Sequence, residues 1–570
     1  LLKASFAATI VVGESPEEVL QRLSQWRDAP SEAQKSETGF SGNTIVSKGW
    51  NEFFGQYRIE TSDLLLQKAH LYGLYIAKAN AVEAMASQPP GITWPALLPS
   101  KVHYYGVWLW DIFFLGLPLV STSEYRLVEG SLLTLLDNQH ANGLIPIATF
   151  PTRQEPHPEP LTQAPVLAMA GWGVYRAKGF YEGEGQAHRF LRKVYPKLKS
   201  FHSFWYRERD RDGDGMCEYI HGWESGVDNS PYWDKRGAEG VEDLLLAIFM
   251  YLDWKYWAAM ARVLGLKDEE RDFLAEAQRI EETVLTEFYD RETGLFYPRY
   301  FDTHELIRIK TFESLLPLLL DGIGGDQRRS IVSHLTDPKE FWTEYPVPTV
   351  AVDEPTFGSK FSGAWWRKPV WLSANWLILK GLMKWGYYTE AKCIIDRTVQ
   401  LVLRSAREEF GKRRFGENYD PLNGKMTQGQ VYFFGWNGLV SSMIVEFFGG
   451  IGFYHPVGHL VFDPICGATM RVQIFDCFVS TEKGRYTFGF ANSRVLTADQ
   501  GVRCEVMARS DQKITIRLDS RRTEPLALIA HGDYFDKDVR VRVEGTVVGV
   551  GRQVSWSQAQ FPVTIDLMPA

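Results

Sequence analysis

The sequence has few of the residues that cross-link a chain or form a familiar metal or nucleotide motif. Its 570 residues include only five cysteines, which are widely spaced and odd in number. We therefore expect no disulfide framework and no zinc site, and a reducing compartment suits such a chain. The phosphate-binding loop, the glycine-rich dinucleotide fingerprint and the paired-histidine zinc motif are all missing. We accordingly predict no cofactor and no resident metal.

The chain also lacks a strong charge bias and an obvious leader or membrane-spanning run. Its net charge of -8 argues against nucleic acid and anionic membranes as partners. We see no signal peptide and no apolar run long enough to cross a bilayer. Because the chain begins at Leu1 and not at methionine, we expect a longer natural N-terminus, with a cytoplasmic location as the working expectation. The oligomeric state is left open.

Helical periodicity dominates the region from about residue 60 to 449. Segments such as 244–252 and 372–383 are apolar around most of the helix, whereas 268–288 is polar on its outer side. Helices buried on both sides behave in the first way, so the alternation predicts an inner ring of helices covered by an outer ring. The expected helices are 62–85, 110–117, 123–138, 160–178, 186–207, 240–264, 268–288, 312–320, 326–335, 370–385, 389–406 and 432–447.

The two ends of the chain have a different pattern. Residues 3–12 read as a strand, and Ser15 is placed to cap a following helix. Residues 457–570 contain short runs of period two separated by turn residues, which predicts a small β-sandwich. The length is that of two to four domains. We expect an N-terminal strand remnant and linker helix at 1–58, a helical catalytic domain at 59–450 and the sandwich at 451–570.

The most unusual stretch is 221–234, which combines glycine, proline and turn-forming residues with carboxylates and tryptophan. Its carboxylates Glu224, Asp228 and Asp234 lie between or beside Trp223 and Trp233. An acid held against aromatic walls keeps its proton near neutral pH, as a glycosidase proton donor must. The alternative is a polar loop anchored by two tryptophans.

A second candidate carboxylate is Glu417, in the turn-rich stretch 415–425. With hydrogen-bonding neighbours and partial solvation it would stay ionised, which suits a general base that activates water. The alternative is a turn with a solvated glutamate.

Further candidates lie in aromatic surroundings. Asp111 stands alone in the apolar run 104–114, where it could bind sugar hydroxyls or cap the following helix. Arg367 lies in the tryptophan-rich stretch 364–375 and could pair with a catalytic carboxylate or with an anionic substrate group; the alternative is a helix start in the core. Gln139 and Asn142 either face a pocket or only cap a helix.

The stretch 210–218 opens like a calcium-binding EF-hand loop, with Asp210, Asp212 and Asp214 at alternate positions and Gly215 sixth. The twelfth position is His221, so the bidentate carboxylate that completes such a site is missing. We interpret the stretch as a turn, with a calcium site as the alternative.

Taken together, the motifs resemble glycoside hydrolase family 63, of the same clan as the family 37 trehalases. The motifs that carry the resemblance appear in the expected order at 108–113, 139–146, 224–234, 366–375 and 417–424, followed by 434–436. The resemblance implies an (α/α)6 barrel and inverting hydrolysis of α-glycosides, with Asp228 as general acid and Glu417 as general base. Tyr232 stands where many relatives carry arginine, and of the family's N-terminal β-domain only 3–12 would remain.

We therefore expect an inverting, exo-acting α-glycosidase with a carbohydrate substrate, in first place an α-glucosidase. Alternatives are a mannosylglycerate or glucosylglycerate hydrolase, a trehalase-like enzyme, an inverting phosphorylase and a sugar-binding barrel without activity. The two carboxyls should lie roughly 6.5–9.5 Å apart, with room for water between them. Residues expected to contact the sugar are Trp108, Trp110, Asp111, Gln139, Asn142, Trp223, Glu224, Trp233, Trp366, Arg367, Trp371 and Trp436.

Overall fold

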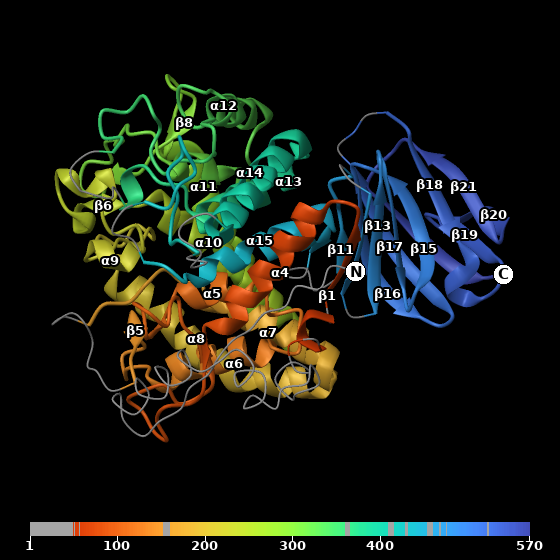
Figure 1. Cartoon of the computed structure of the whole chain (residues 1–570), viewed down its shortest axis with the longest axis horizontal. Helices are drawn as coiled ribbons and strands as arrows, with labels where there is room; N and C mark the ends of the chain where they lie inside the picture. The colour runs from red at the N-terminus through yellow and green to blue at the C-terminus, as the bar shows by residue number, and fades with distance from the viewer. Residues whose placement is uncertain are drawn as a thin grey trace, which may run out of the picture. The chain divides into compact units, whose positions relative to one another are not determined.

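The computed structural model describes residues 50, 52–55, 57–151, 160–358, 365–407, 415–427, 431–452, 460–466, 469–474, 476–520, 522 and 524–570. The chain divides into two compact units, 1–55 and 56–570, and the second contains the helices and sheets. Its first part is helical and its last part consists of β-sheets, drawn in blue in Figure 1. The strand expected at 3–12 and the helix expected after Ser15 lie outside the described residues.

The helical part contains the segments that the periodicity predicts, with shifted ends. The helices are α4 (Leu64–Ala79), α5 (Asp111–Gly116), α6 (Tyr125–Asp137), α7 (Leu167–Glu182), α8 (Glu184–Glu208), α9 (Gly222–Ser225), α10 (Leu244–Leu264), α11 (Lys267–Glu287), α12 (Gly325–Leu335), α13 (Leu372–Lys384), α14 (Tyr388–Arg407) and α15 (Leu439–Met443). Short helical turns of other types are η1 (Pro231–Asp234), η2 (Ala238–Gly240), η3 (Phe312–Leu319), η4 (Trp365–Arg367), η5 (Gly435–Gly438) and η6 (Ile444–Phe448).

Two expected helices differ in a way that matters for the site. The helix expected at 160–178 begins only at Leu167, which leaves 160–166 as a non-helical segment. The helix expected at 432–447 is broken into η5, α15 and η6, because glycines at 435 and 438 weaken its start.

Successive helices alternate between two sets. One set is closed by contacts from α5 to α7, to α10, to η3, to α13 and then through α15 and η5 back to α5. The other set, α4, α6, α8, α11, α12 and α14, packs against members of the first. This closed, alternating series is consistent with the expected (α/α)6 barrel.

Helix α10 illustrates why the inner set is apolar on all sides. Asp243 caps its start by accepting a hydrogen bond from the Leu246 amide at 2.8 Å, and Gly265 ends it in a left-handed conformation. By length and hydropathy it is the one described helix that could cross a membrane, which corrects our expectation that no run is long enough. Because 83% of that window is buried inside the protein, a core helix explains the same composition.

The C-terminal part consists of two antiparallel seven-stranded sheets among the described strands. The first has the order β1 (Tyr57–Thr61), β12 (Met470–Ile474), β13 (Cys477–Glu482), β14 (Arg485–Phe490), β15 (Ser493–Asp499), β18 (Leu526–His531) and β21 (Gln553–Gln558). The second has the order β10 (Ile451–Gly452), β11 (Leu460–Phe462), β16 (Val502–Ser510), β17 (Lys513–Ser520), β22 (Val563–Pro569), β19 (Val539–Val543) and β20 (Thr546–Gly551).

The two sheets face each other across an apolar layer. Phe462 of one sheet stacks on Phe488 of the other with ring centroids 4.3 Å apart, and the buried Tyr486 hydroxyl donates to the Val502 carbonyl oxygen at 2.7 Å. Alternating burial along β12 and β17 supplies the rest of this layer. Strand β1 was not expected: residues 57–61 precede the helices in sequence, yet they pair with β12.

Two-stranded ladders brace the loops of the helical part. They are β2 (Ala81–Val82) with β3 (Ala96–Leu97), β4 (Val107–Trp108) with β5 (Ala148–Thr149), β6 (Val241–Glu242) with β9 (Arg299–Tyr300), and β7 (Tyr289–Asp290) with β8 (Leu295–Phe296). The β4–β5 ladder matters most here, because β4 leads directly into the aromatic run that ends at α5.

Candidate active site

One pocket in the helical part brings together residues from widely separated loops. The described residues that line it are Pro99, Tyr104, Trp108, Trp110, Asp111, Gln163, Gly226, Asp228, Trp366, Trp371, Glu417, Phe434 and Trp436. The space open to water centres is about 90 Å³, and one water needs roughly 10–15 Å³ by that measure. The pocket therefore has room for several waters or for a ligand group of comparable size.

Asp228 reaches the pocket from a loop that is fixed at both sides. Helix α9 ends at Gly226, whose φ of +71° is the left-handed conformation that favours glycine. A Cβ at this position would overlap the Trp110 ring, so glycine also lets the loop pack against the pocket wall. After the turn, the Ser230 amide donates to the Val227 carbonyl oxygen at 2.9 Å. The aspartate thus stands at the tip of a tight, well-bonded turn.

A second clamp on the same loop comes from η4. The Trp366 amide donates to Asn229 Oδ1 at 2.9 Å, and Arg367 Nε donates to the Asn229 carbonyl oxygen at 2.8 Å. Arg367 also forms a two-point ion pair with Asp234, at 3.0 and 2.5 Å. Because Asn229 follows Asp228 directly, these bonds hold the aspartate in position without touching its carboxyl group.

Glu417 reaches the pocket from a loop that lies much later in the sequence than Asp228. Its amide donates to the Val431 carbonyl oxygen at 3.0 Å, and two residues later Tyr419 pairs with Val370 just before α13. The Tyr419 hydroxyl donates to Asn437 Oδ1 at 2.5 Å, which ties this loop to η5. The sequence suggested a partly solvated glutamate, and that expectation was wrong, because Glu417 is buried.

Three carboxyl groups converge on this pocket. Burial raises the pKa of Glu417 to about 8, opposed by the Val431 backbone and the Tyr104 hydroxyl and helped by the charge of Asp228. The surrounding protein raises the pKa of Asp228 to about 7, opposed by its own backbone N–H. Asp228 nevertheless lines the pocket as an exposed residue, so its carboxyl group is accessible to solvent although protein atoms surround it.

The third carboxyl group is Asp111, the first residue of α5. Burial first, and then the charges of Glu417 and Asp228, raise the pKa of Asp111 well above its ordinary value. Three like charges in one pocket repel each other, so at neutral pH the site holds protons that isolated carboxylates would have released. This is the arrangement that acid–base chemistry needs.

Aromatic rings form the walls. Trp366 and Trp371 stack with centroids 4.0 Å apart and planes 5° from parallel, and Trp436 meets Trp371 edge-on at 5.6 Å. Trp110 meets Trp436 edge-on at 5.5 Å, and Tyr104 meets Trp108 in the same way at 5.6 Å. Such faces are suitable platforms for the apolar faces of sugar rings.

Two buried polar atoms of this lining have no hydrogen-bond partner among the described residues. They are the ring nitrogen of Trp108 and Oε2 of Glu417, whereas the Trp436 ring nitrogen hydrogen-bonds Asp111 and lowers its pKa. Buried polar groups are nearly always hydrogen-bonded in native proteins, and exceptions often mark the place of a ligand or a water. One donor and one acceptor in the lining of one pocket fit the hydroxyl groups of a sugar.

Eight of the residues singled out from the sequence therefore meet at the pocket: Asp228, Glu417, Trp108, Trp110, Asp111, Trp366, Trp371 and Trp436. Asp111 both lines the pocket and begins a helix, but its side chain makes no capping hydrogen bond at the helix start.

The other six do not line the pocket, and their contacts explain why. Glu224 is fully buried and accepts hydrogen bonds from Arg209 at 2.8 and 3.2 Å and from the amides of Thr162 and Ile220. Arg367 is engaged with Asp234, as described above. Gln139 donates to the carbonyl oxygens of Gly143 and Lys197 at 2.9 Å.

Asn142 is exposed and accepts a hydrogen bond from the Leu144 amide at 3.2 Å, which closes its own turn. The ring nitrogen of Trp233 donates to the Val227 carbonyl oxygen at 3.2 Å and so braces the loop of Asp228 from behind. Trp223 is exposed on α9. Tyr232, the residue that departs from the family motif, is buried outside the pocket, where its hydroxyl bonds Thr311 at 2.8 Å.

Sequence reasoning missed five lining residues: Pro99, Tyr104, Gln163, Gly226 and Phe434. Gln163 lies in the segment that was expected to be helical, and its Oε1 accepts from the Trp110 amide at 3.2 Å. The signal that could have found Tyr104 was its place in the same aromatic run as Asp111.

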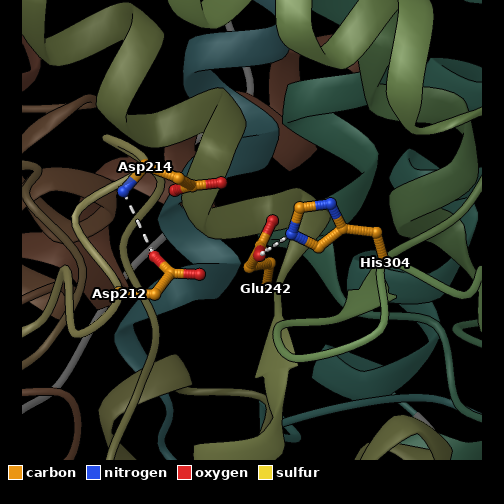
Figure 2. A group of neighbouring side chains, drawn as sticks. All are labelled: Asp212, Asp214, Glu242 and His304. Carbon is orange, nitrogen blue, oxygen red and sulfur yellow. Dashed lines mark hydrogen bonds and ion pairs between the residues drawn. The ribbon is translucent and has the colours of Figure 1, made fainter.

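A group of acidic residues away from the pocket has the composition of a metal site. Figure 2 shows Asp212, Asp214, Glu242 and His304, whose possible ligand atoms all lie within 4.8 Å of one another. However, Arg299 pairs with Glu242 at 2.5 Å and with Asp214 at 3.0 Å, so a guanidinium already balances their charge. Residues 210–216 fold as the expected turn, in which Asp210 accepts from the amides of Gly213 and Gly215.

Comparison with curated proteins gives relatives that act on sugar conjugates. The mannosylglycerate hydrolase of Thermus thermophilus is 27% identical over 406 residues, covering 59% of this chain and 93% of that protein. The glucosylglycerate hydrolase of Mycolicibacterium hassiacum is 24% identical, with 62% and 92% covered. A probable mannosyl-oligosaccharide glucosidase of Schizosaccharomyces pombe is 23% identical, with 71% and 56% covered.

Comparison with solved structures supports the fold. The crystal structure of the family 63 mannosylglycerate hydrolase from Thermus thermophilus in complex with Tris superposes with a TM-score of 0.55 at 23% identity, covering 66% of this chain and 99% of that one. The family model described as the mannosylglycerate hydrolase MGH1-like glycoside hydrolase domain matches residues 104–436, which include every pocket residue except Pro99. Because this match spans more than half of the chain, the chain belongs to the MGH1-like glycoside hydrolases of family 63 and is a glycosidase.

Proposed function

We propose that the protein is an inverting, exo-acting α-glycosidase, in first place an α-glucosidase, with Asp228 as general acid and Glu417 as general base. One observation supports this most strongly: two carboxyl groups from loops far apart in the sequence line the same aromatic pocket. In an inverting reaction one acid protonates the leaving oxygen while the other carboxylate activates a water on the opposite face of the sugar.

The environment of Asp228 suits its role as acid, whereas burial raises the pKa of Glu417 and so disfavours the ionised form that a base needs. Asp228 is accessible from the pocket and has a pKa of about 7, so near neutral pH it can hold a proton and deliver it to a glycosidic oxygen. Glu417 presents Oε2 with no hydrogen-bond partner among the described residues, and this oxygen is free to accept a proton from water. The active form holds one proton, on Asp228 and not on Glu417. Because the pKa of Glu417, about 8, lies above that of Asp228, about 7, this form is the less populated of the two singly protonated forms.

The proposal includes the architecture. We propose that the closed, alternating set of helices is an (α/α)6 barrel, with the pocket formed by loops at one of its ends. The C-terminal sheets would form a separate domain that starts at about residue 451, where β10 begins. None of the described residues of these sheets lines the pocket, which favours an accessory or packing role.

The names of the relatives indicate two candidate classes of substrate. Mannosylglycerate and glucosylglycerate hydrolases act on a sugar joined to glycerate, whereas a mannosyl-oligosaccharide glucosidase is named for an oligosaccharide. The α-glucosidase is our first choice, and a hydrolase of sugar–glycerate conjugates is the second.

The experiment that tests the roles uses a substrate that needs no acid. In α-glucosyl fluoride the leaving group departs without protonation, so Asp228→Asn should hydrolyse it at near the wild-type rate but lose roughly 10²–10⁴-fold on an α-linked disaccharide. Glu417→Gln should lose a comparable factor on both substrates, since both need an activated water. Asp234→Asn, which alters a carboxyl group of the same loop outside the pocket, is the matched control and should not separate the two substrates.

Other outcomes point to the rival functions. Turnover that requires inorganic phosphate and releases a sugar phosphate would indicate a phosphorylase. Sugar binding without turnover of any α-glycoside, the fluoride included, would indicate a binding protein and overturn the proposed function.

A further inference from the structure

Four exposed aromatic residues lie next to pocket residues in the sequence, one in each of four different segments. The exposed fractions of their side chains are 47% for Tyr105, 40% for Trp223, 44% for Trp365 and 37% for Tyr432. Each lies one to three residues from a residue that lines the pocket, namely Tyr104, Gly226, Trp366 and Phe434. Large aromatic rings are costly to expose to water, so several of them around one pocket require an explanation.

Hydrogen bonds and ring contacts, and not only their places in the sequence, connect these residues to the pocket. The Trp365 carbonyl oxygen accepts a hydrogen bond from the ring nitrogen of Trp371 at 3.1 Å. The Trp223 carbonyl oxygen accepts from the Gly226 amide at 3.3 Å. Both Trp371 and Gly226 line the pocket, so the backbones that carry Trp223 and Trp365 are bonded to its wall.

The other two residues are tied in by ring contacts and backbone bonds. Tyr105 packs edge-on against Phe150 at 6.2 Å, and Phe150 packs in the same way against the pocket residue Trp108. The Tyr432 ring meets His103 edge-on at 5.4 Å, and its carbonyl oxygen accepts from the Ser100 hydroxyl at 3.0 Å. Residues 99 and 104, on either side of these partners, both line the pocket.

The backbone at or beside two of these positions is strained, which indicates a functional role for the residues there. Trp365 has a φ of +30° and Phe433, next to Tyr432, has a φ of +58°. Side chains other than glycine rarely adopt these angles, and such strain persists at functional sites where surrounding bonds enforce it. Here the enforced conformations place an exposed ring immediately beside a buried one.

The charge of the pocket gives a second, independent observation. Its described lining contains three carboxyl groups and no lysine, arginine or histidine, and Arg367, next to the lining residue Trp366 in the sequence, is engaged with Asp234. In the active form, in which Glu417 is ionised, a leaving group that carries a carboxylate, as glycerate does, would meet like charge in this site. A neutral leaving group would not.

We propose that Tyr105, Trp223, Trp365 and Tyr432 form an aromatic rim that binds the leaving-group part of the substrate, and that this part is a neutral sugar and not glycerate. The inference rests on the proposed glycosidase function and specifies its substrate class. Aromatic rings stack on the apolar faces of pyranose rings while the sugar hydroxyls stay in water. Such stacking gives an exposed ring beside a sugar pocket a function.

The test compares substrates that differ only in the leaving group. Glucosylglycerol and glucosylglycerate differ by one carboxylate, and the wild-type enzyme should have the higher kcat/KM for the neutral compound. At least one of the α-1,2-, α-1,3-, α-1,4- and α-1,6-linked glucosyl-glucose disaccharides should have a higher kcat/KM than both glucosylglycerol and glucosylglycerate. A higher kcat/KM for glucosylglycerate than for glucosylglycerol and for every disaccharide would overturn the proposal.

The rim is tested with variants on the best disaccharide and on α-glucosyl fluoride, which fills only the pocket. Trp365→Ala and Trp223→Ala should each raise KM for the disaccharide roughly tenfold, with kinetics on the fluoride unchanged, and Trp365→Phe should restore much of the loss. Phe180→Ala removes an equally exposed ring near the far end of α7, about 20 Å along the helix from its first residue, and should change neither substrate.

The remaining outcomes are distinguishable. Unchanged disaccharide KM in both tryptophan variants, or equal losses on disaccharide and fluoride, would overturn the rim. Failure of the wild-type enzyme to hydrolyse the fluoride would instead overturn the proposed function on which the inference rests.

Discussion

The chemistry of the pocket depends on which of its carboxyl groups holds a proton. Reference values for aspartate and glutamate are about 4, whereas here the pKa of Asp228 is raised to about 7 and that of Glu417 to about 8. The cause in both cases is first of all burial by the surrounding protein. An enzyme built on such a pair works best near neutral pH, and not at pH 4–5 as two unperturbed carboxyls would allow.

Tyr104 is a side chain that lowers the pKa of Glu417, after the larger effects of burial, the Val431 backbone and Asp228. Its hydroxyl group hydrogen-bonds Glu417 and lowers the pKa of that carboxyl group, since it stabilises the ionised form. The pKa of Tyr104 itself is raised by burial and by the nearby carboxylates, so its hydroxyl stays protonated and able to donate.

We therefore predict that Tyr104→Phe raises the pKa of Glu417 and moves the acid limb of the kcat/KM profile to higher pH by roughly one unit, the equivalent of ~1.4 kcal/mol. The measurement is kcat/KM for α-glucosyl fluoride between pH 5 and 10. Tyr105→Phe, which removes the hydroxyl of the exposed neighbour and keeps its ring, is the control and should leave the limb in place. An unmoved limb in Tyr104→Phe would show that the hydroxyl does not act on the base.

Among the structural elements, the loop after α9 matters most for the chemistry, because it positions Asp228. It has to turn sharply at Gly226, pass close to Trp110 and present Asp228, while Asn229 is held by Trp366 and Arg367. Hydrogen bonds from Trp366 and Arg367 to Asn229 fix this loop, and of these two partners only Trp366 also lines the pocket.

Gly226→Ala should accordingly cut kcat by at least tenfold, because the new methyl group overlaps the Trp110 ring and either the ring or the loop must move. Gly265→Ala is a matched control: Gly265 has a nearly equal φ of +78° and ends α10, but a Cβ there would meet nothing within 4 Å. Both variants should lose stability through the left-handed backbone, by about 1 kcal/mol. Equal activities of the two variants would contradict the role assigned to the Trp110 contact.

The same loop shows what the sequence could and could not tell. Composition predicted a functional loop at 221–234, since no regular element tolerates that mixture of residues, and the family resemblance, not composition, selected Asp228 as its acid. Sequence reasoning assigned the neighbours less well: Glu224 and Trp233 were expected at the sugar, but their partners, Arg209 and the Val227 carbonyl oxygen, hold the loop from within. Whether a side chain points into a pocket or behind its wall depends on tertiary contacts that periodicity does not encode.

The same limit explains the elements that were missed. The α7 start at Leu167 freed Gln163 for the pocket, and β1 joined a sheet whose other strands lie about 400 residues later. Long, strongly periodic helices such as α10 and α11 were predicted closely, because their apolar pattern reflects burial that any fold of this chain must provide.

For the molecule as a whole, the pocket is a cost to stability. A buried acid with a raised pKa holds its proton more tightly in the folded state, so between about pH 4.5 and 8 the unfolded state binds fewer protons. The free energy of unfolding therefore falls as pH rises through this window, and the stability contributed by the bound proton is fully present only below it. Sites shaped for function commonly carry such a cost.

We predict that Glu417→Gln, which cannot ionise, removes part of this pH dependence. Its thermal midpoint should exceed that of the wild type at pH 8.5 and approach it at pH 5, in thermal unfolding curves recorded under otherwise identical conditions. Glu292→Gln, at an exposed position, is the control and should follow the wild type at both values. A constant difference between Glu417→Gln and the wild type across the window would contradict the raised pKa of Glu417.

The central claim is that Asp228 and Glu417 act across one pocket on opposite faces of a sugar, with a water between Glu417 and the anomeric carbon. The most direct test is a proton NMR time course of the glucose released from α-glucosyl fluoride by the wild-type enzyme. The account predicts that β-glucose appears first and then mutarotates. If α-glucose appears first, the reaction retains configuration and the assignment of Glu417 as a general base is wrong.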